Sequence, residues 1–509
     1  MLNFKKMKMK KILILLAIAV TFGSCDNGFD ELNVNPTKPT QLDPSTKLTY
    51  IQLYTAGSGY ASYLFWNVIH LMQNVQHLNE TNYGTIFLYQ TNNTHWLFEQ
   101  QFSTTVKNIV DLEAQLEVSE EPTAAVDLAI ARVQKVLIFS RITDVYGDIP
   151  YSEAGKGYLE GIRFPKYDQQ SAIYADMLTT LESSAATLSS GGASSYGSAD
   201  LFYGGDVAKW KKFANSLMLR LAMRLVKVDA AGAQAWAAKA ITGGVMTSND
   251  DIAYIQYENN SNDTGPNVNP LTKCFTSRSA NQNKISKTLM DFMKDRNDPR
   301  VSVLCSTTSG STDPALQFGQ DINDFSQTSA NSKPNVNIFG GALSDGSRII
   351  IYDAPFFYQT YAEVEYMLAE AAQRWGLAGG DVEAHYNAGV KAAMEYLSMY
   401  GHGVNITQTQ INDYLAANPF DSSKALQMIN EQYWIATFGN ANETFANWRR
   451  SGYPVLVPAN LANTYTGGQI PRRLNYPGSE LLNNPVNVQE AIDRQGGDLL
   501  TTRMWWDVN

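Results

Sequence analysis

Apolar residues recur at three- and four-residue spacing over most of this 509-residue chain. In the stretch 123–146, Val126, Ile130, Val133 and Leu137 would share one face of a helix, the spacing of a helix that buries one side. Comparable patterns predict further helices over 48–80, 96–118, 168–189, 207–228, 232–242, 360–375, 382–400, 408–416 and 422–439. Because amphipathic helices must bury their apolar faces against one another, we expect a mainly α-helical fold.

The helical pattern stops between about 245 and 350, where Asn, Ser, Thr, Gly and Asp dominate. There we predict one helix, Lys284–Lys294, and short strands at Ala253–Tyr257 and Arg348–Tyr352. The last 70 residues also read as loops. Long loops are uncommon unless they carry function. We therefore predict a helical scaffold over about 45–242 and 355–440 that supports a loop-rich ligand half, about 245–350 plus the C-terminal loops.

The N-terminus has the pattern of a lipoprotein signal. Five lysines lie within residues 1–11, an apolar run follows from Ile12 to Phe22, and small residues lead directly to Cys25. The run is too short for a permanent membrane span but suits the core of a signal peptide. We expect cleavage after residue 24, lipid attachment to the sulfur of Cys25, and a lipid-anchored chain outside the cytoplasm. Ordinary secretion with an incidental cysteine is the alternative.

Charge sets further limits. The chain has 49 acidic and 39 basic side chains, a formal net charge of −10, and cleavage of residues 1–24 would remove five lysines and no acid, leaving −15. Such a chain lacks the basic surface that nucleic-acid binding requires. Only 17% of its residues are charged, so uncharged side chains must provide much of the polar surface. We expect residues 25–44 to form a lipidated tether and 45–509 to form a single domain.

Four segments carry a family resemblance. Residues 144–154 read DVYGDIPYSEA, 210–224 read WKKFANSLMLRLAMR, 443–454 read ETFANWRRSGYP, and 470–477 read IPRRLNYP. Together with the lipobox, these blocks and their order resemble the SusD/RagB-type outer-membrane lipoproteins of Bacteroidota. The subtype resembled is the SusD-like group whose tether contains Asn-x-Asn-Pro, here Asn33–Pro36.

This resemblance covers nearly the whole mature chain. It implies a SusD-like fold in which tetratricopeptide-like helix pairs support an irregular half with short strands. It also implies a cell-surface lipoprotein that binds an oligosaccharide and acts as a lid on a SusC-like TonB-dependent β-barrel transporter of the outer membrane. Neither a cofactor nor catalysis is part of that function.

The charged residues of the shared blocks are predicted to be structural. Arg220 and Arg224 would lie one turn apart on a helix that otherwise reads as buried. Planar guanidinium groups suit the clamping of carbonyl and carboxylate oxygens. We assign Asp144, Arg220, Arg224, Arg449 and Arg473 to internal networks. An anion-binding arginine cluster is the alternative.

The sequence gives little evidence of a catalytic site. Glycan hydrolysis needs two carboxylates across a cleft, whereas Glu363, Glu365 and Glu370 are expected on the solvated face of an amphipathic helix. The sequence has no His-Glu-x-x-His, EF-hand loop or Gly-x-Ser-x-Gly motif. We therefore predict a protein without catalytic residues, metal or cofactor.

Two stretches have the composition of a sugar-binding site. Neutral sugars present hydroxyls and apolar C–H faces, which amide side chains and aromatic rings can bind. Asn79–Trp96 and Tyr254–Asn283 combine both kinds of side chain. The residues that we expect at the ligand are Asn79, Tyr83, Tyr89, Trp96, Tyr257, Asn260, Asn262 and Asn283.

Three other functions are kept as hypotheses. Relatives of the RagB type capture oligopeptides, so a peptide ligand is an alternative. The other two are a surface glycoside hydrolase and a tetratricopeptide-type scaffold with no nutrient ligand.

Overall fold

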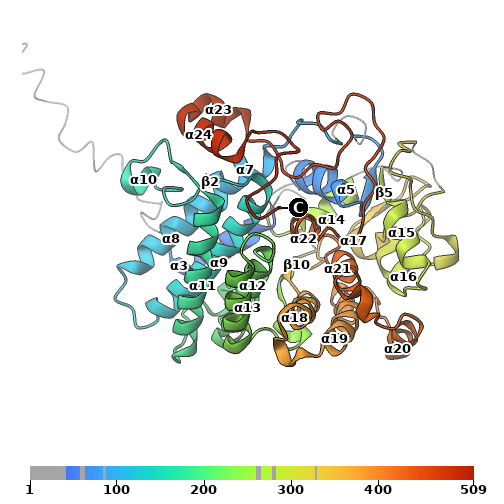
Figure 1. Ribbon diagram of the computed structural model, residues 1–509, viewed down its shortest axis with the longest axis horizontal. Helices are drawn as coiled ribbons and strands as arrows, with labels where there is room; N and C mark the ends of the chain where they lie inside the picture. The colour runs from blue at the N-terminus through green and yellow to red at the C-terminus, as the bar shows by residue number, and fades with distance from the viewer. Residues whose placement is uncertain are drawn as a thin grey trace, which may run out of the picture. The chain divides into compact units, whose positions relative to one another are not determined.

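Two groups of packed helices dominate the structure, a computed structural model that describes residues 42–57, 63–83, 88–259, 265–277, 282–326 and 330–508. In the first group each long helix packs against the next along the chain, from α8 to α9, α11, α12 and α13 (Figure 1). Its helices are α3 (Pro44–Thr55), α7 (Trp96–Gln101), α8 (Lys107–Glu117), α9 (Ala124–Tyr146), α10 (Gly157–Glu160), α11 (Gln170–Ser189), α12 (Val207–Arg224) and α13 (Ala230–Gly243).

Helix α9 shows why these elements form where they do. Ile130, Val133 and Leu137 are fully buried, as their spacing predicts. The helix ends at Gly147, whose φ of +84° is accessible to glycine and strained for other residues. The turn lets the chain pair the short strands β2 (Ile149–Pro150) and β3 (Tyr167–Asp168).

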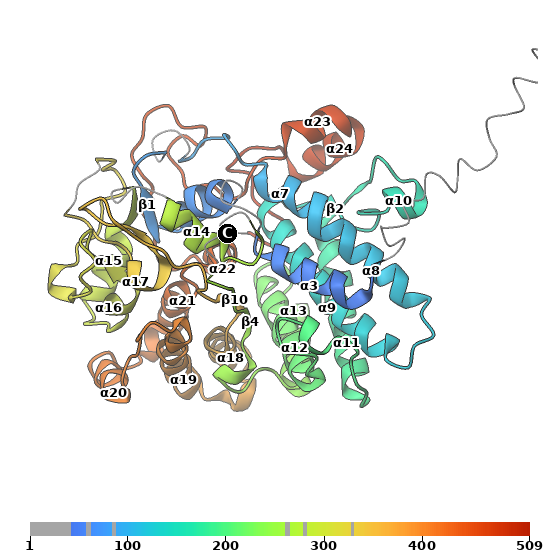
Figure 2. The ribbon, with the colours of Figure 1, turned by 180° about the vertical axis from the view of Figure 1, so that it is seen from behind.

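The second group of helices follows the loop-rich region. Helix α18 begins with a capping box between Thr360 and Glu363 and ends at Gly376 in the left-handed conformation. It packs against α19, α21 and α12, and so joins the two groups (Figure 2). The helices are α18 (Tyr361–Trp375), α19 (Val382–Glu395), α20 (Gln408–Ala417), α21 (Ala425–Ala436), α22 (Ala441–Ser451), α23 (Gly478–Asn483) and α24 (Pro485–Gln495).

Between these groups the chain forms short strands and short helices. Every strand pair in the described residues is antiparallel and two-stranded: β1 (Leu78–Glu80) with β5 (Asn283–Ile285), β4 (Ala253–Ile255) with β10 (Phe356–Gln359), β6 (Cys305–Ser306) with β7 (Lys333–Pro334), and β8 (Gly341–Ala342) with β9 (Arg348–Ile349), besides β2 with β3. The short helices are α14 (Pro270–Ser277), α15 (Lys287–Lys294), α16 (Arg300–Leu304) and α17 (Val336–Phe339).

Shorter π-helical and 3₁₀ segments complete the described elements. The π-helical segments are η1 (Leu64–Leu71), which continues into α5 (Met72–Asn74), and η2 (Phe102–Val106). The 3₁₀ turns are Gly197–Ala199, Asn249–Asp251, Pro314–Leu316, Ala378–Gly380, Tyr396–Tyr400 and Ser422–Lys424. Among the described helices, none is both long enough and apolar enough to cross a bilayer.

The predicted fold class, mainly helical with tetratricopeptide-like pairs and a loop-rich half, is confirmed. One predicted helix, 48–80, is wrong in two places: α3 already ends at Thr55, and the residues after Asn74 are not helical. Helix α5 stops at Asn74, Gln76 takes a φ of +54°, and the following residues form β1. Pairing with β5 gives this segment backbone partners that the local apolar spacing cannot reveal.

The prediction that the last 70 residues are loops is also wrong. They contain α22, α23 and α24. Helix α24 starts with Pro485, ends at Gly496 in the left-handed conformation, and buries only Val488 and Ala491. Because only two positions of α24 are buried, its sequence does not show the regular apolar spacing from which a helix is predicted. In the loop-rich half, α14, α16 and α17 are likewise additional to the predicted helix.

Candidate functional site

The strand pair β1–β5 positions the first of the two candidate stretches. In its register Glu80 lies opposite Asn283. The buried Glu80 carboxylate accepts hydrogen bonds from the backbone N–H groups of Asn82, at 3.1 Å, and Tyr83. The carboxylate therefore holds the turn in which Tyr83 leaves the strand.

Three half-buried rings, Phe65, Tyr83 and Trp96, form what we call the aromatic surface. The Phe65 ring lies 5.9 Å from that of Trp96 with 16° between their planes, and 6.0 Å from that of Tyr83 with 56° between them. The indole N–H of Trp96 donates to Oδ1 of Asn93 at 3.2 Å, which fixes the ring orientation. Partly exposed flat rings can stack on the apolar C–H faces of sugars, while their buried parts hold them in place.

Tyr89 connects this region to the C-terminal loop. Its side chain is buried, and its hydroxyl oxygen accepts the N–H of Ala459 at 2.9 Å. Its carbonyl oxygen accepts the N–H of Tyr465 at 3.2 Å. A further contact, from the Gln76 amide to the carbonyl oxygen of Val457 at 2.5 Å, ties the same two segments together. Residues 457–465, which we call the C-terminal loop, are therefore fixed beside the segment that carries the aromatic surface.

Asn79 connects β1 to a third segment. Its side-chain amide donates to the carbonyl oxygens of Asp321 at 2.7 Å and Asp324 at 2.8 Å. Within that loop, Asn323 accepts the N–H of Asn460 at 2.6 Å. Segments near residues 80, 322 and 460 thus meet at one place, although more than a hundred residues separate each from the next.

The predicted ligand residues have different positions in the structure. Tyr83 and Trp96 meet through Phe65, whereas Asn79, Tyr89 and Asn283 are buried supports near them. Tyr257 is not brought to this group: it is buried in the core, and burial raises the pKa of its hydroxyl well above the usual value. Asn260, Asn262 and the predicted lipidation site Cys25 lie outside the described residues.

Phe65 was missed by the sequence reasoning. It lies in the run Tyr63–Trp66, where Tyr63, Leu64 and Trp66 are buried, inside the segment 48–80 that was predicted to be a helix. The π-helical geometry of η1 changes which residues share a face. An aromatic residue just before a buried partner was the only sequence signal.

A buried ion network lies at the centre of the helices. Arg220 and Arg224, one turn apart on α12, bind Glu363 at 2.6 Å and Glu443 at 2.5 Å. Arg224 also lies 3.5 Å from the carboxylate of Asp144. Burial would raise the pKa of Glu443, but Arg224 and then Arg220 hold it below its usual value. These charges are internally paired, as their assignment to structural networks requires.

The other two assigned arginines bind chiefly the backbone. Arg449 donates to the carbonyl oxygens of Arg472, at 2.7 Å, and Asp144. Arg473 donates to the carbonyl oxygen of Leu474 and pairs with Asp498 at 3.1 Å. Both arginine side chains are fully buried.

The expectation that Glu363, Glu365 and Glu370 face solvent is wrong. Their exposed fractions are 1%, 6% and 1%. Each has a cationic or hydrogen-bonding partner from elsewhere in the chain: Glu365 binds His385 at 2.6 Å, and Glu370 binds Arg450. No group of three or more His, Cys, Asp or Glu side chains in the described part of the chain is arranged to hold a metal ion.

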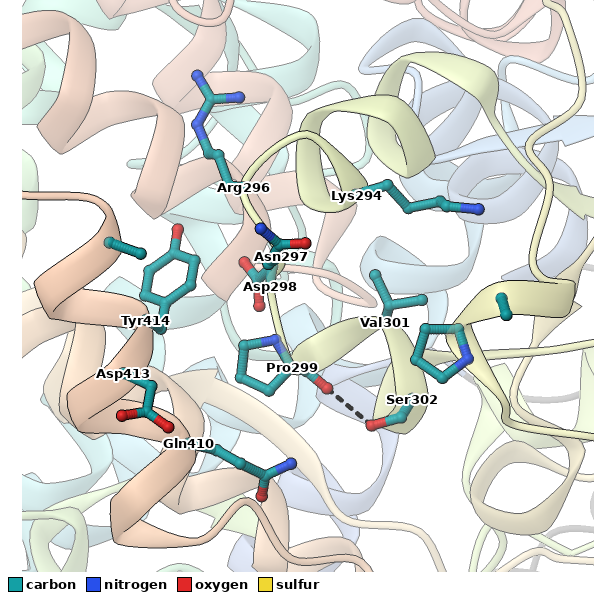
Figure 3. A pocket seen from close by; sticks show the side chains of 13 residues that line it. Lys294, Arg296, Asn297, Asp298, Pro299, Val301, Ser302, Gln410, Asp413 and Tyr414 are labelled. Atoms are coloured by element: carbon teal, nitrogen blue, oxygen red, sulfur yellow. Dashed lines mark hydrogen bonds between the residues drawn. The ribbon is translucent and has the colours of Figure 1, made fainter.

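A pocket of about 580 Å³ lies elsewhere, between α20 and the turn that precedes α16. Figure 3 shows Asp413 and Gln410 of α20 on one side and the Asn297–Pro299 turn beside them. Its one aromatic ring, Tyr414, is buried, and its hydroxyl accepts a hydrogen bond from Gln432 at 2.9 Å. Because this pocket offers no exposed ring face, its chemistry suits sugar stacking less well than the aromatic surface does.

Comparison with known proteins decides the family. Residues 36–477 match the SusD-like family described as "Starch-binding associating with outer membrane". The chain belongs to the SusD-like family. The resemblance drawn from the four sequence blocks is therefore confirmed. No curated protein sequence matches the chain.

Solved SusD-like structures share the fold. One, titled "chitin-binding protein", is 33% identical, covers 92% of this chain and 100% of its own, and has a TM-score of 0.80. A Bacteroidetes SusD-like protein is 26% identical, with 92% and 100% coverage and a TM-score of 0.78. A chitin-binding SusD homolog from Flavobacterium johnsoniae is 25% identical, with 91% and 98% coverage and a TM-score of 0.75.

Proposed function

We propose that this SusD-like protein binds oligosaccharides through the aromatic surface. The observation that carries the proposal is the group of half-buried rings Phe65, Tyr83 and Trp96, which contact one another through Phe65. Chitin-binding proteins of the same fold support oligomers of N-acetylglucosamine as the first ligand to test.

Binding without turnover fits the carboxylates of this chain. Glu363, Glu370 and Glu443 are buried and paired with arginines. A glycosidase needs one carboxyl group that can donate a proton and a second one across an open cleft. Carboxylates neutralised inside a helix bundle are not available for either role.

The N-terminal sequence and the family support a place at the cell surface. We propose that Cys25 carries the lipid anchor and that residues 25–44 act as the tether. On this proposal the protein closes over a SusC-like TonB-dependent barrel, and delivers the bound oligosaccharide to it. The family's association with the outer membrane supports the location.

Trp96→Ala and Phe65→Ala test the binding site. Each substitution is expected to weaken chitohexaose binding about tenfold, because each removes one aromatic contact. Isothermal titration of the purified chain measures the affinity, and circular dichroism checks the fold. Trp236→Ala is the matched control, since Trp236 is a half-buried ring on α13, beside Lys239 and outside the aromatic surface.

Unchanged affinity in both correctly folded variants would contradict the assigned surface. Maltohexaose and mixed oligopeptides serve as competing ligands in the same titrations. Preferential binding of peptides would replace the glycan proposal with the RagB-type alternative, and release of reducing ends would show a hydrolase.

The lid proposal has its own measurement. The chain, tagged at its C-terminus and extracted in detergent from outer membranes, is expected to co-purify with a TonB-dependent barrel. Isolation as a single species from native membranes, with no barrel present, would count against the lid role while leaving glycan binding untouched.

A further inference from the structure

A pocket that shares no lining residue with the aromatic surface combines an exposed tryptophan with arginines. This pocket of about 330 Å³ lies where the start of α11, the end of α24 and the C-terminal segment meet. Its volume falls in the range of small-ligand sites and suits one or two sugar rings. We call it the Trp505 pocket.

Trp505 is a rigid, open ring. Its neighbours Met504 and Trp506 are buried, so the backbone on both sides is anchored, whereas Trp505 itself is 36% exposed. Tyr174 contacts it edge-on, with ring centroids 6.0 Å apart and 61° between the planes. A tryptophan held at the edge of a pocket can stack on a sugar without losing much conformational freedom.

Two arginines line the pocket, and each has N–H groups that form no hydrogen bond within the described part of the chain. Arg494 donates to the carboxylate of Asp148 and to the carbonyl oxygen of Tyr167. Arg503 donates to Asp507 at 2.9 Å through one terminal nitrogen. Because each guanidinium has five N–H groups, both keep unused donors, and their side chains are 30% and 42% exposed.

The start of α11 adds backbone donors. Asp148 accepts the N–H of Gln170 at 2.9 Å, but Gln169 provides no side-chain cap. The N–H of Ser171, in the first turn, therefore has no partner within the helix, at the end where the helix dipole is positive. The carboxylate that lines this pocket, that of Asp148, is already paired with Arg494.

Gln170 forms part of the pocket wall. Its side chain is 1% exposed and lines the pocket, and its Oε1 has no hydrogen-bond partner. Its amide group is already used, donating to the carbonyl oxygen of Thr143 at 2.9 Å. The Oε1 atom of Gln170 is itself buried, so a ligand in the pocket would meet the arginines and the Ser171 N–H instead.

We propose that the Trp505 pocket binds an anionic sugar unit, one that carries a carboxylate or a sulfate group. The sugar ring stacks on Trp505, and its acidic group receives hydrogen bonds from Arg494, Arg503 and the Ser171 N–H. This site is separate from the aromatic surface, so it does not depend on the function proposed above.

Titration of the full-length chain in detergent tests the site. The probes are hexamers of galacturonate, which carry carboxylates, sulfated κ-carrageenan oligosaccharides, which carry sulfates, and neutral chitohexaose. Trp505→Ala is expected to weaken binding of the anionic probe about tenfold. Arg503→Gln is expected to remove most of the salt dependence of that binding. The control Trp236→Ala should leave it unchanged.

Binding of either anionic probe with this pattern supports the site, and the better probe identifies the acidic group. The proposal is overturned if the wild type binds neither anionic probe, or if Trp505→Ala and Arg503→Gln, both with unchanged melting temperature, bind as the wild type does. Loss of anionic binding in Trp96→Ala instead would move the ligand to the aromatic surface. Chitohexaose binding is scored separately, so failure of one site is distinguishable from failure of the other.

Discussion

Glu370 illustrates how single residues of this chain are adapted to burial. Its two carboxylate oxygens accept hydrogen bonds from Arg450, at 2.7 and 2.8 Å, and one also accepts from Arg374 at 2.7 Å. Burial by itself would raise the pKa of Glu370, but Arg450 and then Arg374 lower it to about 2, from an ordinary value of 4.5. The carboxylate therefore stays ionised at any pH that the protein normally meets.

This pKa predicts an acid-sensitive contribution to stability. Because the folded-state pKa lies below the unfolded one, the stabilisation is complete above about pH 4.5 and is lost as the pH falls toward about 2. Glu370→Gln should lower the free energy of unfolding by about 3 kcal/mol at neutral pH, and by less in acid. Urea unfolding at several pH values measures both. Glu117→Gln, at an exposed ion pair, is the control, and a difference independent of pH would contradict the prediction.

At the scale of elements, very short strands position the candidate site. Strand β1 has three residues, yet two of its side chains and that of Tyr89 fix three segments by hydrogen bonds to backbone groups. Asn79 holds the loop Asp321–Asp324, Glu80 holds the turn at Tyr83, and Tyr89 holds the C-terminal loop. Side-chain hydrogen bonds to backbone groups thus fix the positions of these irregular segments, as the hydrogen bonds of a longer sheet would do.

Tyr89→Phe tests this arrangement. It leaves the N–H of Ala459 without an acceptor, at a cost of about 1 to 2 kcal/mol. We expect faster hydrogen exchange over residues 457–465, with unchanged protection in α9. Tyr50→Phe, an exposed ring on α3, is the control. If exchange over 457–465 does not change, the hydroxyl does not hold the loop.

Across the whole molecule, the buried ion network links helices that are far apart in sequence. Arg220 and Arg224 of α12 reach Glu363 of α18 and Glu443 of α22. The hydroxyl oxygen of Tyr433, on α21, lies within hydrogen-bond distance of both glutamates, 3.0 Å from Glu363 and 2.7 Å from Glu443. Helices from both groups therefore meet at one set of charges, which discriminates against packings that would leave a charge unpaired.

Arg224→Met should be strongly destabilising, since it leaves the carboxylates of Glu443 and Asp144 buried without this partner. The expected loss is about 3 to 5 kcal/mol, measured by urea unfolding. Lys211→Met, on the same helix with an intermediate exposure, should change stability little. Equal effects of the two substitutions would show that the network contributes nothing specific.

The sequence by itself determined most of the long helices, the loop-rich half and the family, because these depend on local spacing and on contiguous blocks of residues. The 3.6-residue repeat placed α9 to within a residue at its start, and the four blocks indicated the SusD-like family. Narrow stripes such as that of α24 gave too weak a periodic signal. Helices with a wide apolar stripe could therefore be predicted from the sequence, and helices with a narrow one could not.

Only the tertiary structure decided which side chains are buried and which meet. Glu370 reads as a solvated helix residue until Arg450, 80 positions away, is seen to bind it. Tyr83 and Tyr257 look alike in sequence, yet one joins Phe65 at the surface and the other lies in the core. The reason is physical: exposure is set by every segment that packs on a residue, and those segments come from distant parts of the chain.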